Sequence, residues 1–294
     1  MFYLIYGLLY IISLLPLRLL YVFSDLAYFL IYDLAGYRKK VVLQNLAIAF
    51  PEKTEKERIK IAKQFYRNFT DTFIETIKLI SAGKSFILKH FTGDSRILDE
   101  LYRKGKKCQV HLGHNFNWEL ANLWMPLCTS YQLLVVYMPI NNKVLDKLFL
   151  KIRKKTGSHL LPATKISSAI VPYRNQTYLM ALVADQNPGV PANGYWLNFF
   201  GKPAPFVKGP EKGARSNDTA VVFAQFTKKK RGYYELHLEL ATEDPLSLPE
   251  TELTRIYIRY LERVIRMHPE MWLWSHRRWK HEWKPEYGMV NGEW

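Results

Sequence analysis

Short apolar runs alternate with segments of helical periodicity through the middle of the chain, and this alternation constrains the fold most strongly. The expected strands cover residues 108–112, 132–137, 178–184, 220–226 and 233–240. The expected helices cover residues 95–104, 117–127, 142–156, 165–173, 209–217 and 250–267. Such alternation is typical of parallel strands joined by helices. The pattern therefore predicts an α/β fold with a mostly parallel central sheet flanked by helices.

The N-terminal segment is strongly apolar. No charged side chain occurs from Met1 to Pro16, and a second apolar run reaches Tyr32. The first run is shorter than the roughly 20 residues that a spanning helix needs. The segment therefore either spans a bilayer at a tilt or lies in its interface, unless it is a buried core helix. The basic cluster at residues 38–40 indicates the cytoplasmic side. We expect residues 1–35 to be a helical membrane anchor and residues 36–294 to be the main domain.

The charge of the chain points to an anionic partner. Lys and Arg number 42 against 26 Asp and Glu, which gives a net charge of +16. This excess suits a nucleic acid, anionic lipid head groups or an acidic carrier protein. The two cysteines, Cys108 and Cys128, form no disulfide framework, and no spacing resembles a zinc site.

A histidine and a glutamate follow the first of the central strands. His114 stands in a turn opened by Gly113, and Glu119 lies at the start of the next expected helix. Open α/β sheets place their chemistry at the carboxyl ends of strands. A carboxylate in the first helical turn can reach back to the imidazole, giving a base with its orienting partner. The alternative is that His114 is an ordinary polar residue of a loop.

An aspartate follows the neighbouring expected strand, 178–184. Asp185 opens the segment Asp-Gln-Asn-Pro-Gly189, and its side chain is expected at the same sheet edge as His114. All of these residue types except Gln also favour turns, so a purely structural role fits equally well.

An apolar loop rich in Gly and Pro, residues 198–210, leads into an expected helix. Pro210 suits the first helical turn, which leaves Lys208 and Gly209 at the helix N-terminus. Free N–H groups and the helix dipole favour an anion there. A phosphate, a carboxylate or a reaction oxyanion would suit this position.

The segment from Trp272 to Trp283 interleaves tryptophans with basic side chains. Arg and Trp combine in cation–π contacts. Such interleaving suits single-stranded nucleic acid, and it suits an anionic lipid interface equally well.

Several of these segments occur in an order that resembles a known family. They are Asn45-Leu46 with Phe50-Pro-Glu52, His114-x4-Glu119, Arg153-x3-Gly157, Asp185-Gln186, Phe199-Phe-Gly201 and Trp274-Ser-His-Arg-Arg-Trp-Lys280. The chain resembles the late acyltransferases of lipid A biosynthesis, of the lauroyl/myristoyl transferase type, within the lysophospholipid acyltransferase superfamily. The resemblance covers nearly the whole chain.

The resemblance implies a glycerolipid-acyltransferase-like fold, with residues 36–294 as the acyltransferase domain. It implies an enzyme of the bacterial inner membrane that faces the cytoplasm. Such an enzyme moves a fatty acyl chain from acyl carrier protein to a hydroxyl of an anionic lipid A precursor. No metal and no organic cofactor are implied. By motif match, His114 is the general base and Glu119 its orienting carboxylate.

The substrate is expected to contact a further set of residues: Asn117, Arg153, Asp185, Lys208 and Gly209. One departure from the family concerns Met138, where many members carry Arg, and it leaves an aminolipid or a lysophospholipid as alternative acceptors. A basic membrane-surface or nucleic-acid-binding protein is the alternative that is not an enzyme. Nucleic acid is not expected as a partner, because it explains neither the apolar N-terminus nor the His114 turn.

Overall fold

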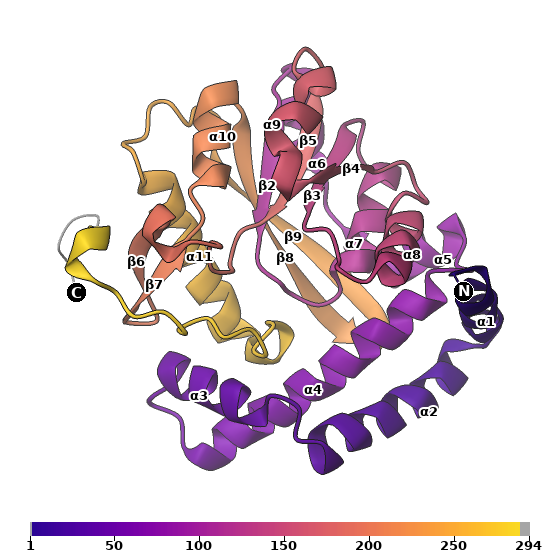
Figure 1. Cartoon of the computed structure of the whole chain (residues 1–294). Coiled ribbons are helices and arrows are strands. Elements are labelled where there is room, and N and C mark those ends of the chain that lie inside the picture. The colour runs from indigo at the N-terminus through magenta and orange to yellow at the C-terminus, as the bar shows by residue number, and fades with distance from the viewer. Residues whose placement is uncertain (1, 289–294) are drawn as a thin grey trace.

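The computed structural model describes residues 2–288 and contains a seven-stranded sheet with helices on either side (Figure 1). The strands in spatial order are β1 (Phe91–Gly93), β9 (Tyr233–Thr242), β8 (Ala220–Lys230), β2 (Cys108–Leu112), β5 (Tyr178–Val183), β3 (Gln132–Tyr137) and β4 (His159–Pro162). Neighbouring strands are parallel except β8 and β9, which form an antiparallel hairpin. The prediction of an α/β fold with a mostly parallel sheet is confirmed.

The helices agree closely with their expected ranges. The α-helices are α1 (Phe2–Leu14), α2 (Leu17–Tyr28), α3 (Lys39–Ala49), α4 (Glu55–Lys78), α5 (Lys84–His90), α6 (Arg96–Arg103), α7 (Trp118–Trp124), α8 (Lys143–Arg153), α9 (Ile166–Ala169), α10 (Gly209–Asn217) and α11 (Glu252–Met267). A π-helix, η1 (Phe29–Leu34), continues α2. Short 3-10 helices are η2 (Met125–Leu127), η3 (Ala163–Lys165), η4 (Val171–Tyr173), η5 (Pro191–Asn193), η6 (Pro269–Met271) and η7 (Pro285–Tyr287).

A second, two-stranded sheet replaces much of the expected loop at 198–210. Strands β6 (Tyr195–Phe199) and β7 (Lys202–Phe206) pair in antiparallel register. Phe200 and Gly201 both have positive φ, which suits a two-residue hairpin turn. The prolines of β7 are tolerated because a two-stranded sheet leaves one edge of each strand unpaired. The expectation of an irregular loop was wrong. Pro and Gly usually indicate loops, and here they occur in an edge strand and in the hairpin turn.

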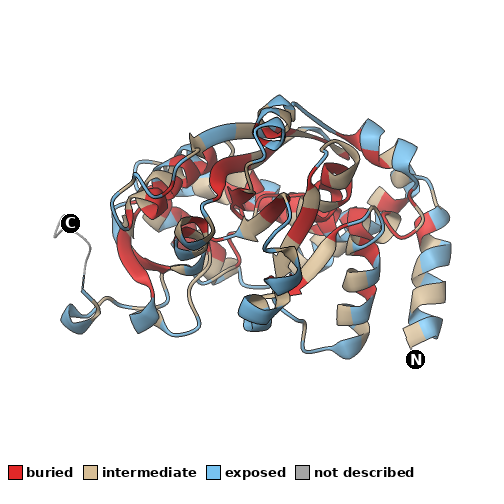
Figure 2. Ribbon diagram, turned by 90° about the horizontal axis from the view of Figure 1, so that it is seen from above, coloured by how far each residue is buried: buried red, intermediate tan, exposed pale blue. Residues whose placement is uncertain are grey.

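The N-terminal helices pack with one side on the rest of the protein. No single helix among residues 2–288 is long and apolar enough to cross a bilayer, and α1 meets Leu17–Leu34 at a bend of 117°. Phe2, Tyr6 and Leu9 of α1 contact the main hydrophobic core. The opposite side exposes large apolar residues, namely Tyr3, Leu4, Leu8, Ile11, Leu14, Leu19, Val22, Phe23 and Leu26. In Figure 2 the central strands are largely red, whereas α1 at the N-terminal end is mostly tan and pale blue. The role of this segment as a membrane anchor stays a prediction.

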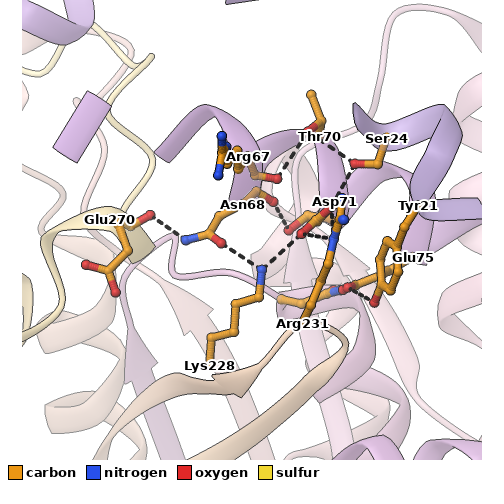
Figure 3. Close-up of polar contacts among 12 residues, drawn as sticks. Tyr21, Ser24, Arg67, Asn68, Thr70, Asp71, Glu75, Lys228, Arg231 and Glu270 are labelled. Carbon is orange, nitrogen blue, oxygen red and sulfur yellow. Dashed lines mark hydrogen bonds and ion pairs between the residues drawn. The ribbon is translucent and has the colours of Figure 1, made fainter. Parts of the chain in front are cut away.

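A buried carboxylate on α4 fastens the N-terminal helices to the sheet (Figure 3). Asp71 is 2% exposed and accepts a hydrogen bond of 2.7 Å from Ser24 on α2. Lys228 on β8 and Arg231 in the β8–β9 turn approach its oxygens at 3.0 and 2.7 Å. Arg231 also pairs with Asp25 of α2 at 2.6 Å. Two cations from the hairpin are thus neutralised on the helical layer, which ties α2, α4 and the sheet together.

The variant Asp71→Asn tests this arrangement. It leaves Lys228 and Arg231 without their buried counter-charge, so we expect the free energy of unfolding to fall by about 3 kcal/mol. Denaturant unfolding of the purified protein in detergent measures this change. Asp94→Asn is the matched control, because Asp94 and its partner Arg96 are both exposed and exposed pairs contribute little. Equal stability of Asp71→Asn and the wild type would contradict the assignment.

Candidate active site

The turn after β2 lies at the centre of the sheet, because β2 pairs with β5 on one side and with β8 on the other. Gly113 opens this turn where there is no room for a side chain. A Cβ at this position would lie 2.7 Å from Leu261 Cδ1 and 3.3 Å from Asp185 Oδ2. Glycine therefore allows the backbone of the turn to approach both the Asp185 carboxylate and helix α11.

His114 and Asp185 form a hydrogen-bonded pair at the carboxyl ends of β2 and β5. His114 Nδ1 lies 2.5 Å from Asp185 Oδ1, and the backbone N–H of His114 donates to Oδ2 at 2.8 Å. Trp272 Nε1 donates to the same Oδ2 at 2.6 Å. The Asp185 side chain is 1% exposed and that of His114 is 23% exposed. A buried carboxylate thus holds an imidazole that remains accessible.

The charge state of Asp185 determines which nitrogen of His114 carries the proton. Burial alone would raise the pKa of Asp185, but His114 and the hydrogen bond from Trp272 lower this pKa to about 2. The ionised carboxylate can only accept hydrogen bonds, so Nδ1 of His114 must donate. Nε2 is then an acceptor in the neutral ring, and the Gln186 amide nitrogen lies 3.3 Å from it. The pair presents a base at Nε2.

Glu119 does not take the position expected for it. Its side chain is buried and accepts hydrogen bonds from Arg153 Nε at 2.9 Å and from Arg153 Nη2 at 2.5 Å. Trp118 Nε1 also donates to Glu119, at 3.2 Å. Glu119 therefore orients Arg153 at the end of α8, and Asp185 orients His114. The prediction that Glu119 orients His114 is corrected, because a carboxylate from the neighbouring strand already occupies Nδ1.

Asn117 is a structural residue at the start of α7. It is fully buried, and its Oδ1 accepts a hydrogen bond from the backbone of Leu120 as a helix N-cap. Its Nδ2 donates to Glu75 Oε2 at 2.8 Å, inside the protein. Both polar ends are engaged, which corrects the expectation that Asn117 contacts the substrate.

Lys208 and Gly209 stand at the N-terminus of α10, as expected. Lys208 Nζ lies 4.8 Å from the centre of the Tyr195 ring. Within residues 2–288, no hydrogen bond joins Lys208 or Gly209 to His114 or Asp185. Their part in binding an anion or an oxyanion stays a prediction.

The aromatic and basic segment near the C-terminus is buried beside the candidate site. We call residues 268–279 the C-terminal strap. Trp272, Trp274 and Arg278 are each 1% exposed or less. They cannot offer a surface to a nucleic acid or to lipid head groups, so that expectation is corrected for these three residues. Residue types that suit a wet interface also suit a core in which indole N–H groups find partners.

The strap is held by hydrogen bonds from distant parts of the sequence. The backbone N–H of Phe116 donates to the Met271 carbonyl at 3.1 Å, next to the His114 turn. The Asn45 amide on α3 donates to the carbonyls of Trp274 and His276 at 2.8 and 2.7 Å. The Asn45 and Trp274 segments, which are far apart in the sequence, are therefore hydrogen-bonded to each other. The path of the strap places the Trp272 indole within hydrogen-bond distance of Asp185.

Comparison with known proteins defines the class of protein. The family described as bacterial lipid A biosynthesis acyltransferase matches residues 1–281, and the chain belongs to this family. The chain is therefore an acyltransferase of lipid A biosynthesis.

Two curated relatives are similar over most of their length. The lipid A biosynthesis palmitoleoyltransferase of Escherichia coli (strain K12) is 23% identical over 255 residues, which are 83% of this chain and 79% of the relative. The lipid A biosynthesis acyltransferase of Shigella flexneri gives the same identity and the same coverage.

The pH dependence of stability tests the His114–Asp185 pair. The folded pKa of Asp185, about 2, lies below the ordinary value of about 3.9 for this side chain. The pair therefore stabilises the fold fully above about pH 4, and this contribution is lost as the pH falls towards 2. We expect a contribution of about 3 kcal/mol.

Unfolding of the wild type and of Asp185→Asn between pH 7 and pH 2.5 measures this contribution. The stability difference between the two proteins should be constant above about pH 4 and should shrink below it. A difference that stays constant down to pH 2.5 would show that Asp185 is not held as an ionised partner of His114.

Proposed function

We propose that this acyltransferase moves a fatty acyl chain from acyl carrier protein to a hydroxyl of a lipid A precursor, with His114 as general base. The observation that carries the proposal is the 2.5 Å hydrogen bond from His114 Nδ1 to Asp185. This bond fixes the imidazole so that Nε2 is an acceptor that can take up a proton. Membership in the lipid A acyltransferase family supports the class of reaction.

The chemistry requires a base because an alcohol attacks a thioester poorly while it keeps its proton. In the proposed step, Nε2 of His114 takes the proton as the lipid oxygen forms its bond to the acyl carbon. Asp185 stabilises the imidazolium that results. The C–S bond then breaks, and the imidazolium returns the proton to the leaving thiolate. The acyl chain arrives activated as a thioester, so no covalent enzyme intermediate is needed.

Gln186 indicates where the acceptor hydroxyl would bind. Its amide nitrogen lies 3.3 Å from His114 Nε2. An incoming hydroxyl would replace this amide as the partner of the ring nitrogen. Gln186 directly follows Asp185 in the sequence, and its side chain has to leave Nε2 when the hydroxyl binds.

The Glu119–Arg153 pair supports the other side of the candidate site. Trp118 donates to Glu119 and lies edge-on to the His114 ring, with 5.7 Å between ring centroids. We propose that the pair fixes the first turn of α7 beside His114. Arg153 keeps 17% of its side chain exposed, which supports a contact with the anionic acceptor.

The tetrahedral intermediate carries an oxyanion that needs nearby hydrogen-bond donors. The ammonium group of Lys208 and the backbone N–H of Gly209 at the start of α10 are the proposed donors. They follow β7, and α10 begins at Gly209. A helix N-terminus stabilises negative charge through its free N–H groups and its dipole.

The net charge of +16 supports an acidic protein as the acyl donor. Charge complementarity raises the rate of encounter between a basic enzyme and an acidic carrier protein. Acyl carrier protein is therefore the proposed donor, and transfer from acyl coenzyme A is the outcome that would contradict it.

The exposed apolar side of α1 and α2 supports attachment to a membrane. Lys147 of α8 places its amine 5.1 Å from the ring centre of Tyr3, which is exposed on this side. Aromatic rings beside amines are typical of the interface between hydrocarbon and anionic head groups. We propose that this end lies in the cytoplasmic leaflet of the bacterial inner membrane, where the acceptor resides.

A second acceptor class is favoured by one residue. Met138 follows β3 and is 67% exposed, at the position where the resemblance leads one to expect an arginine. Without this cation the site is less suited to phosphorylated sugars. An aminolipid or a lysophospholipid is therefore the alternative acceptor, with the same mechanism.

Kinetics of point variants test the assigned roles. We expect His114→Ala to lower kcat at least about 100-fold, because general base catalysis contributes 10²–10⁴-fold. Asp185→Asn should cause a loss in the same range, since an amide cannot stabilise the imidazolium. His237→Ala is the control, because His237 lies exposed on β9. Undiminished transfer by His114→Ala would refute the proposal.

Mass spectrometry of lipids tests the acceptor. In a strain that lacks the gene, lipid A should lose one acyl chain, and the wild-type gene should restore it. His114→Ala should not restore the chain, because the base is missing. If lipid A is unchanged while an aminolipid or a lysophospholipid loses an acyl chain, the alternative acceptor replaces the first.

A further inference from the structure

Helix α8 carries a row of exposed lysines without a counter-charge. Lys143, Lys147 and Lys151 follow one another at intervals of four residues, and all three are exposed. Residues four apart lie on the same face of a helix, and like charges at this spacing repel each other. Among residues 2–288, no carboxylate forms an ion pair with any of the three. We call these three residues the lysine row.

The local structure of α8 does not account for the lysine row. Lys143 is the first residue of the helix, where the helix dipole disfavours a cation. Asp146 is the one acidic residue of α8, and it accepts a hydrogen bond of 2.9 Å from the backbone N–H of Ile140. Lys155, just after the helix, is different because it donates to two backbone carbonyls at 2.9 Å. The lysine row thus points to an anion outside the protein.

The lysine row follows one flank of α1, and the two helices lie at the same end of the molecule (Figure 1). Lys147 Nζ lies 4.5 Å from the centre of the Phe2 ring and 5.1 Å from that of Tyr3. Phe2 contacts the hydrophobic core, whereas Tyr3 is 77% exposed. Lys151 Nζ lies 3.9 Å from the centre of the Tyr6 ring. The amines therefore lie along the border between the packed and the exposed sides of α1.

The exposed side of α1 is entirely apolar along its length. Leu4, Leu8 and Ile11 recur at helical spacing and are 80%, 61% and 65% exposed, and α1 contains no charged residue. A helix with such a side lies in the membrane interface with its apolar residues in the hydrocarbon. Amines at the border of that side then lie at the depth of the lipid phosphates.

We propose that the lysine row binds the phosphates of anionic phospholipids next to α1. This inference rests on the proposed attachment of the enzyme to a membrane, and it names the lipid class and the residues that select it. Each amine in contact with an anionic bilayer surface strengthens binding. An acidic carrier protein would also satisfy the charges. The apolar side of α1 favours the lipid, because a carrier protein docked on α8 would leave Leu4 and Leu8 in water.

The position of α8 gives the lysine row a consequence for the reaction. Lys151 precedes Arg153 by two residues on the same helix. Arg153 pairs with Glu119, and Trp118 donates to Glu119 beside the His114 ring. Lipid head groups along α8 would therefore surround the helix that ends at the candidate site. This arrangement orients the site towards the leaflet that supplies the acceptor.

Sedimentation with vesicles tests the inference on the full-length protein diluted from detergent. One set of vesicles contains phosphatidylcholine alone, and the other contains phosphatidylcholine and phosphatidylglycerol in equal parts. The double variant Lys147→Gln/Lys151→Gln should bind the anionic vesicles about 30-fold more weakly than the wild type, since each lysine contributes about fivefold. Both proteins should bind the neutral vesicles equally, because the apolar side of α1 is unchanged.

Three control variants separate charge from structure. Lys56→Gln/Lys60→Gln removes two exposed lysines near the start of α4, whereas α1 contacts the end of α4 through Lys78, which donates to Ser13 at 2.9 Å. This variant should bind both kinds of vesicle as the wild type does. Lys147→Arg/Lys151→Arg keeps the charges and the ring contacts, so it should also bind normally.

Lys143→Gln removes a charge that makes no contact with the rings of α1 among residues 2–288. It should weaken binding to anionic vesicles about fivefold. Normal binding by this variant would show that the other two lysines act only by holding α1. Near-ultraviolet circular dichroism verifies the fold of each variant.

An equal loss on both kinds of vesicle by Lys147→Gln/Lys151→Gln, or no loss on either, would overturn the inference. Unchanged vesicle binding with a raised KM for acyl carrier protein would assign the lysine row to the donor and would overturn it too. Binding of the wild type to neither kind of vesicle would refute the proposed membrane attachment itself. Full activity of His114→Ala would refute the proposed catalytic role without affecting sedimentation, so the failures are distinguishable.

Discussion

The hydrogen bond between His114 and Asp185 is the interaction on which the candidate site depends. It exists because β2 and β5 are neighbouring parallel strands, so that their carboxyl ends meet at one edge of the sheet. Gly113 leaves room for the close approach of the two turns. The carboxylate is buried and the imidazole is accessible, which is the arrangement that a general base requires.

The elements around this pair come from widely separated parts of the sequence. The strap brings Trp272 to Asp185, and Asn45 on α3 holds the strap in turn. Glu75 on α4 accepts from Asn117 at the start of α7 and from Tyr21 on α2, at 2.8 Å in both cases. The apolar N-terminal helices and the candidate site therefore share one set of buried polar contacts.

Much of the fold was predictable, whereas the site was predictable only in part. The alternation of apolar strand segments with helical segments predicted the parallel sheet, because the spacing of apolar residues reflects which side chains are buried. The β6–β7 hairpin was missed because Pro203 and Pro205 resemble loop residues. Glu119 was assigned to the wrong partner, because spacing along a chain does not fix where a side chain points. Trp272 was taken for an interface residue, because indoles serve both interfaces and cores.

The sequence by itself determined the strands, the helix starts and the residue types available for chemistry, because these follow from local periodicity, capping and composition. Only the tertiary structure decided the pairing of charges: Asp185 with His114, Glu119 with Arg153, and Arg278 with no carboxylate among residues 2–288. The physical reason is that a buried charge is stabilised by whichever group packing brings within a few ångströms. These groups lie far apart in the sequence, and their distances depend on strand order and on the path of the C-terminal strap.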